Sequence, residues 1–204
     1  MPRDKTESHE RIVGAAKKEF LEYGFADASL RRIAADAKIQ VSGLYRHFAS
    51  KEEMFADLVE PVVGGFYSLY SQIEDEYFEG LRNADESFEM NGHDETVRIM
   101  EYIYDHHDEF VLIITKSSGT KYENFRHDIA KLEEEVTLRY MESLKSAGYH
   151  VKDINRNEFH LLVTAYIESV FQAVSHGFSQ DEAMHYARTL EDFYGPAWRT
   201  WFGI

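Results

Sequence analysis

The chain has no cysteine and only three prolines among its 204 residues. The lack of cysteine excludes disulfides and Cys-ligated metal, and with them a small disulfide-stapled secreted domain. The scarcity of proline leaves long stretches free to be helical, because proline removes a backbone donor and kinks helices. Apolar residues recur at helical spacing through nearly the whole chain. These features predict an all-α protein.

Long hydrophobic runs are also missing. No uninterrupted apolar stretch approaches the roughly 20 residues that span a bilayer. The first ten residues, MPRDKTESHE, contain no apolar core and do not resemble a signal peptide. We therefore expect a cytoplasmic protein with no membrane partner, long enough for one or two domains with a sizeable core.

Basic residues are in the minority, with 22 Lys and Arg against 37 Asp and Glu. Residues 1–51 nevertheless hold 10 basic and 7 acidic residues, whereas residues 52–204 hold 12 basic and 30 acidic residues. An acidic remainder would repel phosphate and turn the basic end toward a nucleic acid. For the remainder taken alone, solubility is the better explanation of its acidity.

The segment 29–51, SLRRIAADAKIQVSGLYRHFASK, has the pattern of two short helices joined by a tight turn. The hydroxyl of Ser29 is expected to cap the first helix. Ile39 is expected to hold the turn against the core, and Ser50 with Glu53 predicts a capping box for a third helix. The predicted apolar positions are Leu30, Ile33, Ala34 and Ala37 in the first helix and Val41, Leu44, Tyr45 and Phe48 in the second. This arrangement predicts a helix-turn-helix, whose second helix can lie in a major groove.

The stretch LRRIAADAKIQVSGLYRHFASKEEMF resembles the DNA-binding signature of the tetracycline-repressor (TetR-type) family of bacterial transcription regulators. Leu44-Tyr45, His47-Phe48 and Ser50-Lys51-Glu52 stand at the spacing of that family. The preceding GAAKKEFLEYGFADAS is similar to the family's first helix, and FYGPAWRTWFG is similar to its C-terminal end. The resemblance implies a DNA-binding domain over residues 1–50 and a helical ligand-binding and dimerisation domain over residues 51–204, with about nine helices.

The resemblance also implies which residues contact DNA. Arg31, Val41 and Ser42 correspond to base contacts, and an arginine can offer a fork to guanine. Tyr45 is expected to pack its ring beside Leu44 and to place its hydroxyl on phosphate. The full set is Ser29, Arg31, Gln40, Val41, Ser42, Gly43, Tyr45, Arg46, His47 and Lys51, in which Tyr45, His47 and Lys51 would contact phosphate. The chain departs from the family at Lys38 and Ser42, where glycine is usual, and at Gln40, where Ser or Thr is frequent.

The first helix is predicted over about residues 6–23, with Ile12, Ala16, Phe20 and Tyr23 facing inward and Gly24 at its end. A long helix is predicted from Ser50 to the high 70s. It contains Pro61 and Gly64-Gly65, which indicate either a hinge between the two domains or the close packing of another helix.

The rest of the chain is predicted to alternate helices and loops. A loop is expected over residues 83–93, with Asn91-Gly92 as a turn, before a helix over 94–106. Periodicity alone allows a strand over 109–115, but a helix is preferred because no partner strand exists elsewhere. A helix over 122–146 ends before Gly148. The last two helices span about 156–177 and 179–202, with Gly195-Pro196 interrupting the second.

The helix over about 156–177 carries an apolar stripe wider than one neighbouring helix needs. The stripe predicts that the last two helices form a homodimer face, with an ordinary buried core helix as the alternative. The family resemblance further implies a small-molecule effector among the helices of the second domain. The candidate ligand-binding residues are Tyr67, Tyr70, Tyr102, His106, Phe125 and Tyr166, although an aromatic residue at helical spacing is more often part of a core.

Three classes of function can be compared. The first is a regulator, expected to be a repressor in the family's manner, that binds a palindromic operator in double-stranded DNA as a homodimer and is released by a small molecule. The second is a helix-turn-helix protein without an effector, whose second domain serves dimerisation or a protein partner. An enzyme is not expected, because no His-Glu-x-x-His pattern, glycine-rich phosphate loop or nucleophile elbow occurs. Accordingly we expect no catalytic residue, no cofactor and no metal.

Overall fold

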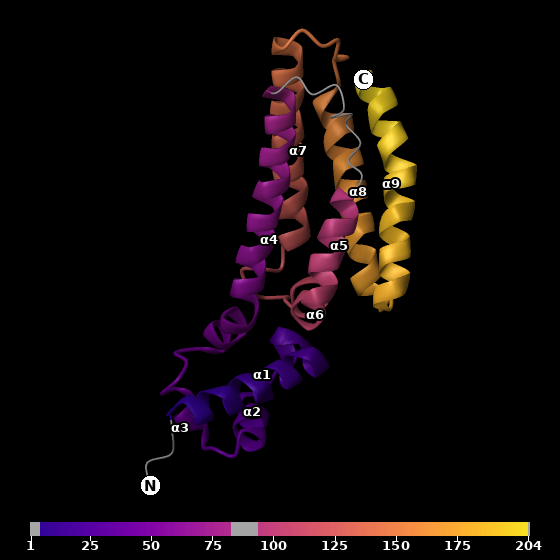
Figure 1. Cartoon of the computed structure of the whole chain (residues 1–204). Coiled ribbons are helices and arrows are strands. Elements are labelled where there is room, and N and C mark those ends of the chain that lie inside the picture. The colour runs from indigo at the N-terminus through magenta and orange to yellow at the C-terminus, as the bar shows by residue number, and fades with distance from the viewer. Residues whose placement is uncertain (1–4, 83–93, 204) are drawn as a thin grey trace. The chain divides into compact units, whose positions relative to one another are not determined.

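The computed structural model of the chain describes residues 5–82 and 94–203, and every regular element in these ranges is a helix (Figure 1). The predicted loop at 83–93, with its Asn91-Gly92 turn, lies outside the described residues. The all-α class is confirmed. The helices are α1 (Lys5–Asp27), α2 (Leu30–Asp36), α3 (Val41–Leu44), α4 (Lys51–Arg82), α5 (Glu95–Asp105), α6 (His107–Thr115), α7 (Phe125–Ser146), α8 (Arg156–Ser175) and α9 (Gln180–Phe202). Within the described ranges no helix is long and apolar enough to cross a membrane.

Contacts divide the chain into two compact units. The first, called the head below, contains residues 1–65 and 106–123; the second, called the body, contains residues 66–105 and 124–204. The early part of α4 groups with the head because the ring of Phe55 packs edge-on against Phe20 and Phe25, at 5.2 and 5.5 Å between centroids. The predicted boundary after residue 50 therefore falls inside the head, and the functional division at that point stays a prediction.

The head is built on α1. Ile12, Ala16 and Phe20 are buried as predicted. The inward orientation predicted for Tyr23 is wrong: its side chain is 43% exposed, and the guanidinium of Arg32 lies 4.0 Å from its ring centroid. A kink follows at Gly24 (φ 75°, ψ 166°), a conformation open essentially to glycine alone, so that Phe25 is the aromatic residue turned into the core.

The segment 107–115 forms the helix α6 and not a strand, which confirms the preferred prediction. Phe110, Leu112, Ile113 and Ile114 are buried. The head uses α6 as a packing partner of α1, since Lys17 on α1 forms ion pairs with Asp108 at 3.0 Å and with Glu109 at 2.8 Å.

The long helix α4 runs without a break past Pro61 to Arg82, a few residues beyond its predicted end. A Cβ atom built on Gly64 would meet no neighbouring atom within 4 Å. Close packing of another helix therefore does not explain this glycine. The hinge interpretation stays a prediction. The boundary between the head and the body, as defined by contacts, falls between Gly65 and Phe66.

In the body, α7, α8 and α9 run side by side with the later part of α4 and with α5 (Figure 1). Ser179 and Glu182 form the predicted capping box of α9. The predicted interruption at Gly195-Pro196 is wrong, because α9 continues through both residues to Phe202. Its last turns are held by aromatic packing on Phe159, which lies 5.9 Å from both Trp201 and Phe202 between ring centroids.

Candidate DNA-binding site and body cavity

The turn between α2 and α3 is closed by backbone hydrogen bonds. The amide of Lys38 donates to the carbonyl of Ala35 at 3.1 Å, and the amide of Ile39 donates to that of Ala34 at 2.9 Å. Lys38 adopts a left-handed conformation with φ 56°, which a non-glycine residue adopts at some cost. The turn thus keeps the geometry that glycine would favour at this position, and the exposed lysine side chain extends into solvent.

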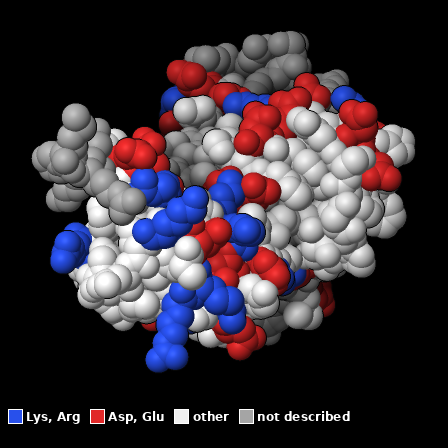
Figure 2. Space-filling model, turned by 90° about the horizontal axis from the view of Figure 1, so that it is seen from below, with Lys and Arg blue, Asp and Glu red and all other residues white. Residues whose placement is uncertain are grey.

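The helix α3 is short, and Leu44 and Phe48 anchor it to the core of the head. Around these two anchors the surface is polar. The exposed candidates on and next to this surface are Arg31, Gln40, Ser42, Tyr45 and Arg46, whereas Ser29, Val41, Gly43, His47 and Lys51 are partly buried. Seen from below, Lys and Arg side chains gather on one face, with acidic side chains among them (Figure 2).

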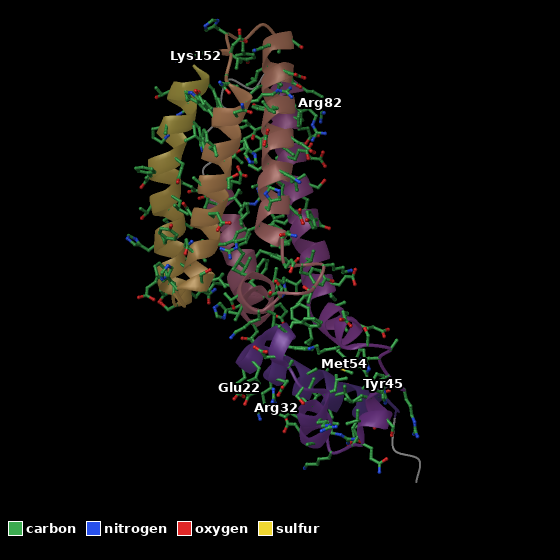
Figure 3. All side chains as sticks on the ribbon, turned by 180° about the vertical axis from the view of Figure 1, so that it is seen from behind. Glu22, Arg32, Tyr45, Met54, Arg82 and Lys152 are labelled. Carbon is green, nitrogen blue, oxygen red and sulfur yellow. The ribbon has the colours of Figure 1, made fainter. Side chains whose placement is uncertain are left out.

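Two expectations about this surface are wrong. The Tyr45 side chain is 54% exposed, so its ring is not buried beside Leu44 as predicted, and its exposed part can contact a partner (Figure 3). The hydroxyl of Ser29 does not cap α2. Instead the backbone amide of Ser29 donates to Oε1 of Glu19 at 2.7 Å. A carboxylate supplied by α1 therefore binds the backbone amide of the N-cap residue, which is a different donor from the first-turn amides that the hydroxyl was expected to cap.

Glu19 is a buried charged residue of the head, with only 7% of its surface exposed. Nε of Arg32 also donates to Oε1 of Glu19 at 2.7 Å, and NH2 of Arg32 donates to the carbonyl of Asp27 at 3.0 Å. Burial alone would raise the pKa of Glu19. The hydrogen bonds from Arg32 and from the Ser29 amide, with the charge of Arg32, outweigh burial and hold that pKa below its usual value.

The two adjacent arginines of α2 therefore differ in role. Arg32 is bound to Glu19 and Tyr23, whereas Arg31 is exposed and has no ion-pair partner among the residues that the structure describes. The sequence did not indicate the Glu19–Arg32 pair, whose members are 13 residues apart. A signal was present, because Glu19 interrupts the buried apolar stripe of α1 beside Phe20.

Lys51 links the start of α4 to the segment that follows α1. Its Nζ donates to the carbonyls of Ala26 at 3.2 Å and Ala28 at 3.3 Å, and lies 4.6 Å from the ring centroid of Phe25. An ammonium group has three donors, so one remains for the predicted phosphate contact. Lys51 thus has a structural role in addition to the one predicted for it.

The helix-turn-helix segment matches a known protein family. The family model described as "Bacterial regulatory proteins, tetR family" matches residues 12–58, which include α2, the turn and α3. This segment is therefore similar to the N-terminal part of tetR-family regulators. An HTH-type transcriptional regulator from Staphylococcus aureus is 34% identical over 77 residues, which are 38% of this chain and 42% of the relative. The chain thus matches less than half the length of that curated relative.

Solved structures of transcriptional regulators extend the likeness to the fold of the whole chain. A TetR-like transcriptional regulator from Rhodococcus sp. RHA1 is 20% identical, with a TM-score of 0.56 over 98% of this chain and 97% of that one. FadR from Bacillus subtilis, solved in complex with stearoyl-CoA, is 13% identical, with a TM-score of 0.56 over 90% of this chain and 95% of that one. At these identities the likeness establishes the fold alone.

The body contains a cavity of about 480 Å³, lined by residues of α4, α5, α7, α8 and α9 and by Asp94. Of the six predicted ligand-binding residues, Tyr70 and Tyr166 line it. Phe125 is buried in an aromatic cluster with Phe66 and Phe171, at 5.7 and 5.8 Å between centroids. The remaining three do not line it: Tyr67 lies beside Phe125, Tyr102 lies beside Phe66, and His106 lies between α5 and α6 and groups with the head.

Four glutamates line the cavity and none was predicted: Glu74, which is paired with Arg139, and the three described next. Glu95 accepts a hydrogen bond from the Tyr77 hydroxyl at 2.9 Å, and Glu133 accepts one from Tyr70. Oε1 of Glu191 accepts from the backbone amide of Thr96 at 3.0 Å and so caps the start of α5. Burial raises the pKa of all three carboxyls above the usual value for glutamate.

These residues were missed because glutamates on helices usually face solvent. A signal existed for Glu133, which stands in the stripe formed by Ile129, Val136, Tyr140 and Leu144 at helical spacing. A carboxylate within an apolar stripe marks either a buried pair or the wall of a cavity.

Proposed function

We propose that the chain is a transcriptional regulator that binds a palindromic operator in double-stranded DNA as a homodimer, and that a small molecule bound in the body releases it from DNA. The observation that carries the DNA-binding role is the helix-turn-helix surface, where Arg31 and Arg46 are exposed without ion-pair partners in the described part of the chain, while Arg32 and Lys51 hold the fold. Such a repressor would act in the cytoplasm, where bacterial DNA lies.

The apolar side chains left exposed on α8 and α9 support the homodimer. Leu161 on α8 is 68% exposed and Phe193 on α9 is 71% exposed, and both lie at similar distances from the short turn that joins the two helices. Large exposed apolar side chains on neighbouring helices are typical of protein interfaces. We propose that this surface, on the helices over about 156–177 and 179–202, packs against its copy across a two-fold axis.

A charge placed on this surface tests the dimer. Leu161→Glu is expected to give a monomer in size-exclusion chromatography with light scattering at micromolar concentration, because two carboxylates would lie at the two-fold interface. Tyr149→Glu is the matched control, since Tyr149 is also exposed but lies outside α8 and α9. A wild-type chain that is monomeric in this measurement would refute the dimer.

The effector role rests on the cavity. Its volume of about 480 Å³ lies within the range of small-molecule pockets. The neighbouring fold solved with stearoyl-CoA supports the idea that a body of this architecture holds a small molecule. The alternative is a helix-turn-helix protein without an effector. A body packed without a cavity would favour that alternative, so the cavity supports the effector role.

The test is a selection of random duplex DNA by the full chain, followed by anisotropy measurements with the selected duplex and a panel of metabolites. We expect a palindrome whose half-sites lie about 34–36 Å apart, or somewhat more, and affinity that falls steeply with salt. We also expect at least one metabolite to weaken binding. Failure to enrich any duplex at low ionic strength would refute the regulator, and enrichment without any metabolite response would favour the alternative.

A further inference from the structure

We propose that the body cavity binds a hydrophobic organic cation, an amine or quaternary ammonium compound, with its charge between Glu95 and Glu133 and its apolar groups against the tyrosine and tryptophan rings of the wall. This inference rests on the proposed role of the cavity as the effector site and names the chemical class of the effector.

The charge of the wall is strongly one-sided. Six carboxylates line the cavity, namely Glu74, Asp94, Glu95, Glu133, Glu191 and Asp192, against two guanidinium groups, Arg188 and Arg199. Neither arginine forms an ion pair within the described residues, and Arg188 is exposed. An anionic ligand would therefore meet a repulsive wall, whereas a cation would supply the charge that the wall lacks.

Glu95 and Glu133 are the two carboxylates available to a cation. Glu74 is already paired with Arg139, and Glu191 accepts the backbone amides at the start of α5. Glu95 and Glu133 instead receive hydrogen bonds from neutral hydroxyls, from Tyr77 to Glu95 and from Tyr70 and Thr137 to Glu133. Arg98, the cation closest in sequence to Glu95, donates through both terminal nitrogens to Glu76.

A partly buried carboxylate without a cation loses hydration at a cost, and hydrogen bonds from neutral hydroxyls compensate for the lost water only in part. Burial accordingly raises the pKa of both carboxyls. A positively charged ligand would reverse this effect by giving each carboxylate an opposite charge in a site of low dielectric. Glu95 and Glu133 thus form an anionic site that has no cationic partner among the described residues.

The rest of the wall suits the apolar part of an organic cation. Tyr77 and Tyr140 meet edge-on at 5.7 Å between centroids, as do Tyr166 and Tyr194 at 5.0 Å, and Trp198 lies beside Tyr194 at 6.2 Å. Ring faces attract cations, and most strongly when water is excluded. A metal ion does not fit, because no group of three or more His, Asp or Glu side chains in the described residues is placed to hold one.

Binding can be followed through Trp198, since the chain contains only two tryptophans. In the full chain carrying Trp201→Phe, Trp198 is the single indole and it lines the cavity. Three probes of similar size are compared: (4-phenylbutyl)trimethylammonium, its neutral analogue with a tert-butyl group in place of the ammonium, and 5-phenylpentanoate. We expect the ammonium to quench or shift Trp198 fluorescence with at least about tenfold higher affinity than either other probe.

Glu95→Gln and Glu133→Gln are each expected to lower the affinity for the ammonium about tenfold or more and to leave the neutral probe unaffected. Glu142→Gln is the matched control, since Glu142 is an exposed residue of the same helix as Glu133 and does not line the cavity. Circular dichroism and thermal unfolding of each variant separate a loss of binding from a loss of fold.

The outcomes distinguish this inference from the proposed function. If the anionic or neutral probe binds as tightly as the ammonium, or if no probe binds at millimolar concentration, the cation site is refuted. The regulator role is judged separately, by selected-duplex binding and by the metabolite panel. A metabolite that is anionic, displaces DNA and loses its effect in cavity variants would refute the cation class while leaving the proposed function intact.

Discussion

Arg31 and Lys51 allow DNA recognition to be separated from the stability of the head. Both are predicted DNA contacts, yet only Lys51 is bound within the fold. Arg31→Ala is therefore expected to leave the free energy of unfolding unchanged within about 0.5 kcal/mol, as for exposed side chains without partners. Lys51→Ala removes two hydrogen bonds to carbonyls and a contact with the ring of Phe25. We expect a loss of about 1–2 kcal/mol.

The expected effects on DNA binding also differ in kind. A bidentate arginine–guanine contact contributes about 1–3 kcal/mol of discrimination, and a homodimer carries Arg31 twice. Arg31→Ala should therefore weaken binding to the preferred duplex by about 30-fold or more. The preference for the contacted base pair should also disappear. Lys51→Ala should weaken binding to all sequences equally and lower the salt slope by about 1 for each lost phosphate contact.

The measurement combines chemical denaturation with fluorescence anisotropy on the selected duplex and on duplexes with single base changes, at several salt concentrations. Arg31→Ala that keeps full base preference would show that this residue has been assigned wrongly. Lys51→Ala that destabilises the head without changing the salt slope would show that Lys51 is structural only. If Lys51→Ala leaves the free energy of unfolding unchanged, the contacts of Lys51 do not stabilise the head as expected.

Two further predictions concern the head. Because the pKa of Glu19 is lowered in the folded chain, the stability that Glu19 contributes is present above its usual pKa of about 4.5 and is lost as pH falls through the folded value. Glu19→Gln should therefore cost about 1–2 kcal/mol at pH 7, and the difference from wild type should shrink below about pH 4.5 in denaturation curves. Gly24→Ala should cost about 1–3 kcal/mol because φ is 75° there. Gly64→Ala, whose added Cβ atom would meet no atom within 4 Å, should stabilise the chain by up to about 1 kcal/mol in the same measurement. Equal effects of the two substitutions would contradict the backbone argument.

The helix-turn-helix was predictable because its signals are local. Turn residues and apolar spacing act within a few positions, so the two short helices and the turn between them follow from the sequence. Predictions that depended on distant partners failed. Tyr23 stands at an inward spacing on α1, but Arg32 of another helix holds its ring at the surface. Pro196 was expected to interrupt α9, but aromatic packing on Phe159 keeps the helix intact beyond it.

The cavity lining was predicted only in part, because it too depends on residues that are distant in the sequence. Tyr70 and Tyr166 were named because aromatic residues fill the second domain, yet the glutamates beside them are defined by the meeting of several helices. Glu95 follows the undescribed segment 83–93, and no residue near it in the sequence reveals its environment. The apolar neighbours of Glu133 at helical spacing are the one indication that the sequence provides.

Net charge is a poor measure of the DNA-binding surface of this head, because much of the basic charge is neutralised within the fold. Lys17 is paired with Asp108 and Glu109, and Arg32 with Glu19. Within the described residues, Arg31, Lys38 and Arg46 have no such partners, and all three stand on α2, on the turn or directly after α3. Phosphate is attracted by charges that are not already compensated. The unpaired cations, and not the small basic excess of residues 1–51, therefore indicate which face of the head we expect to meet DNA.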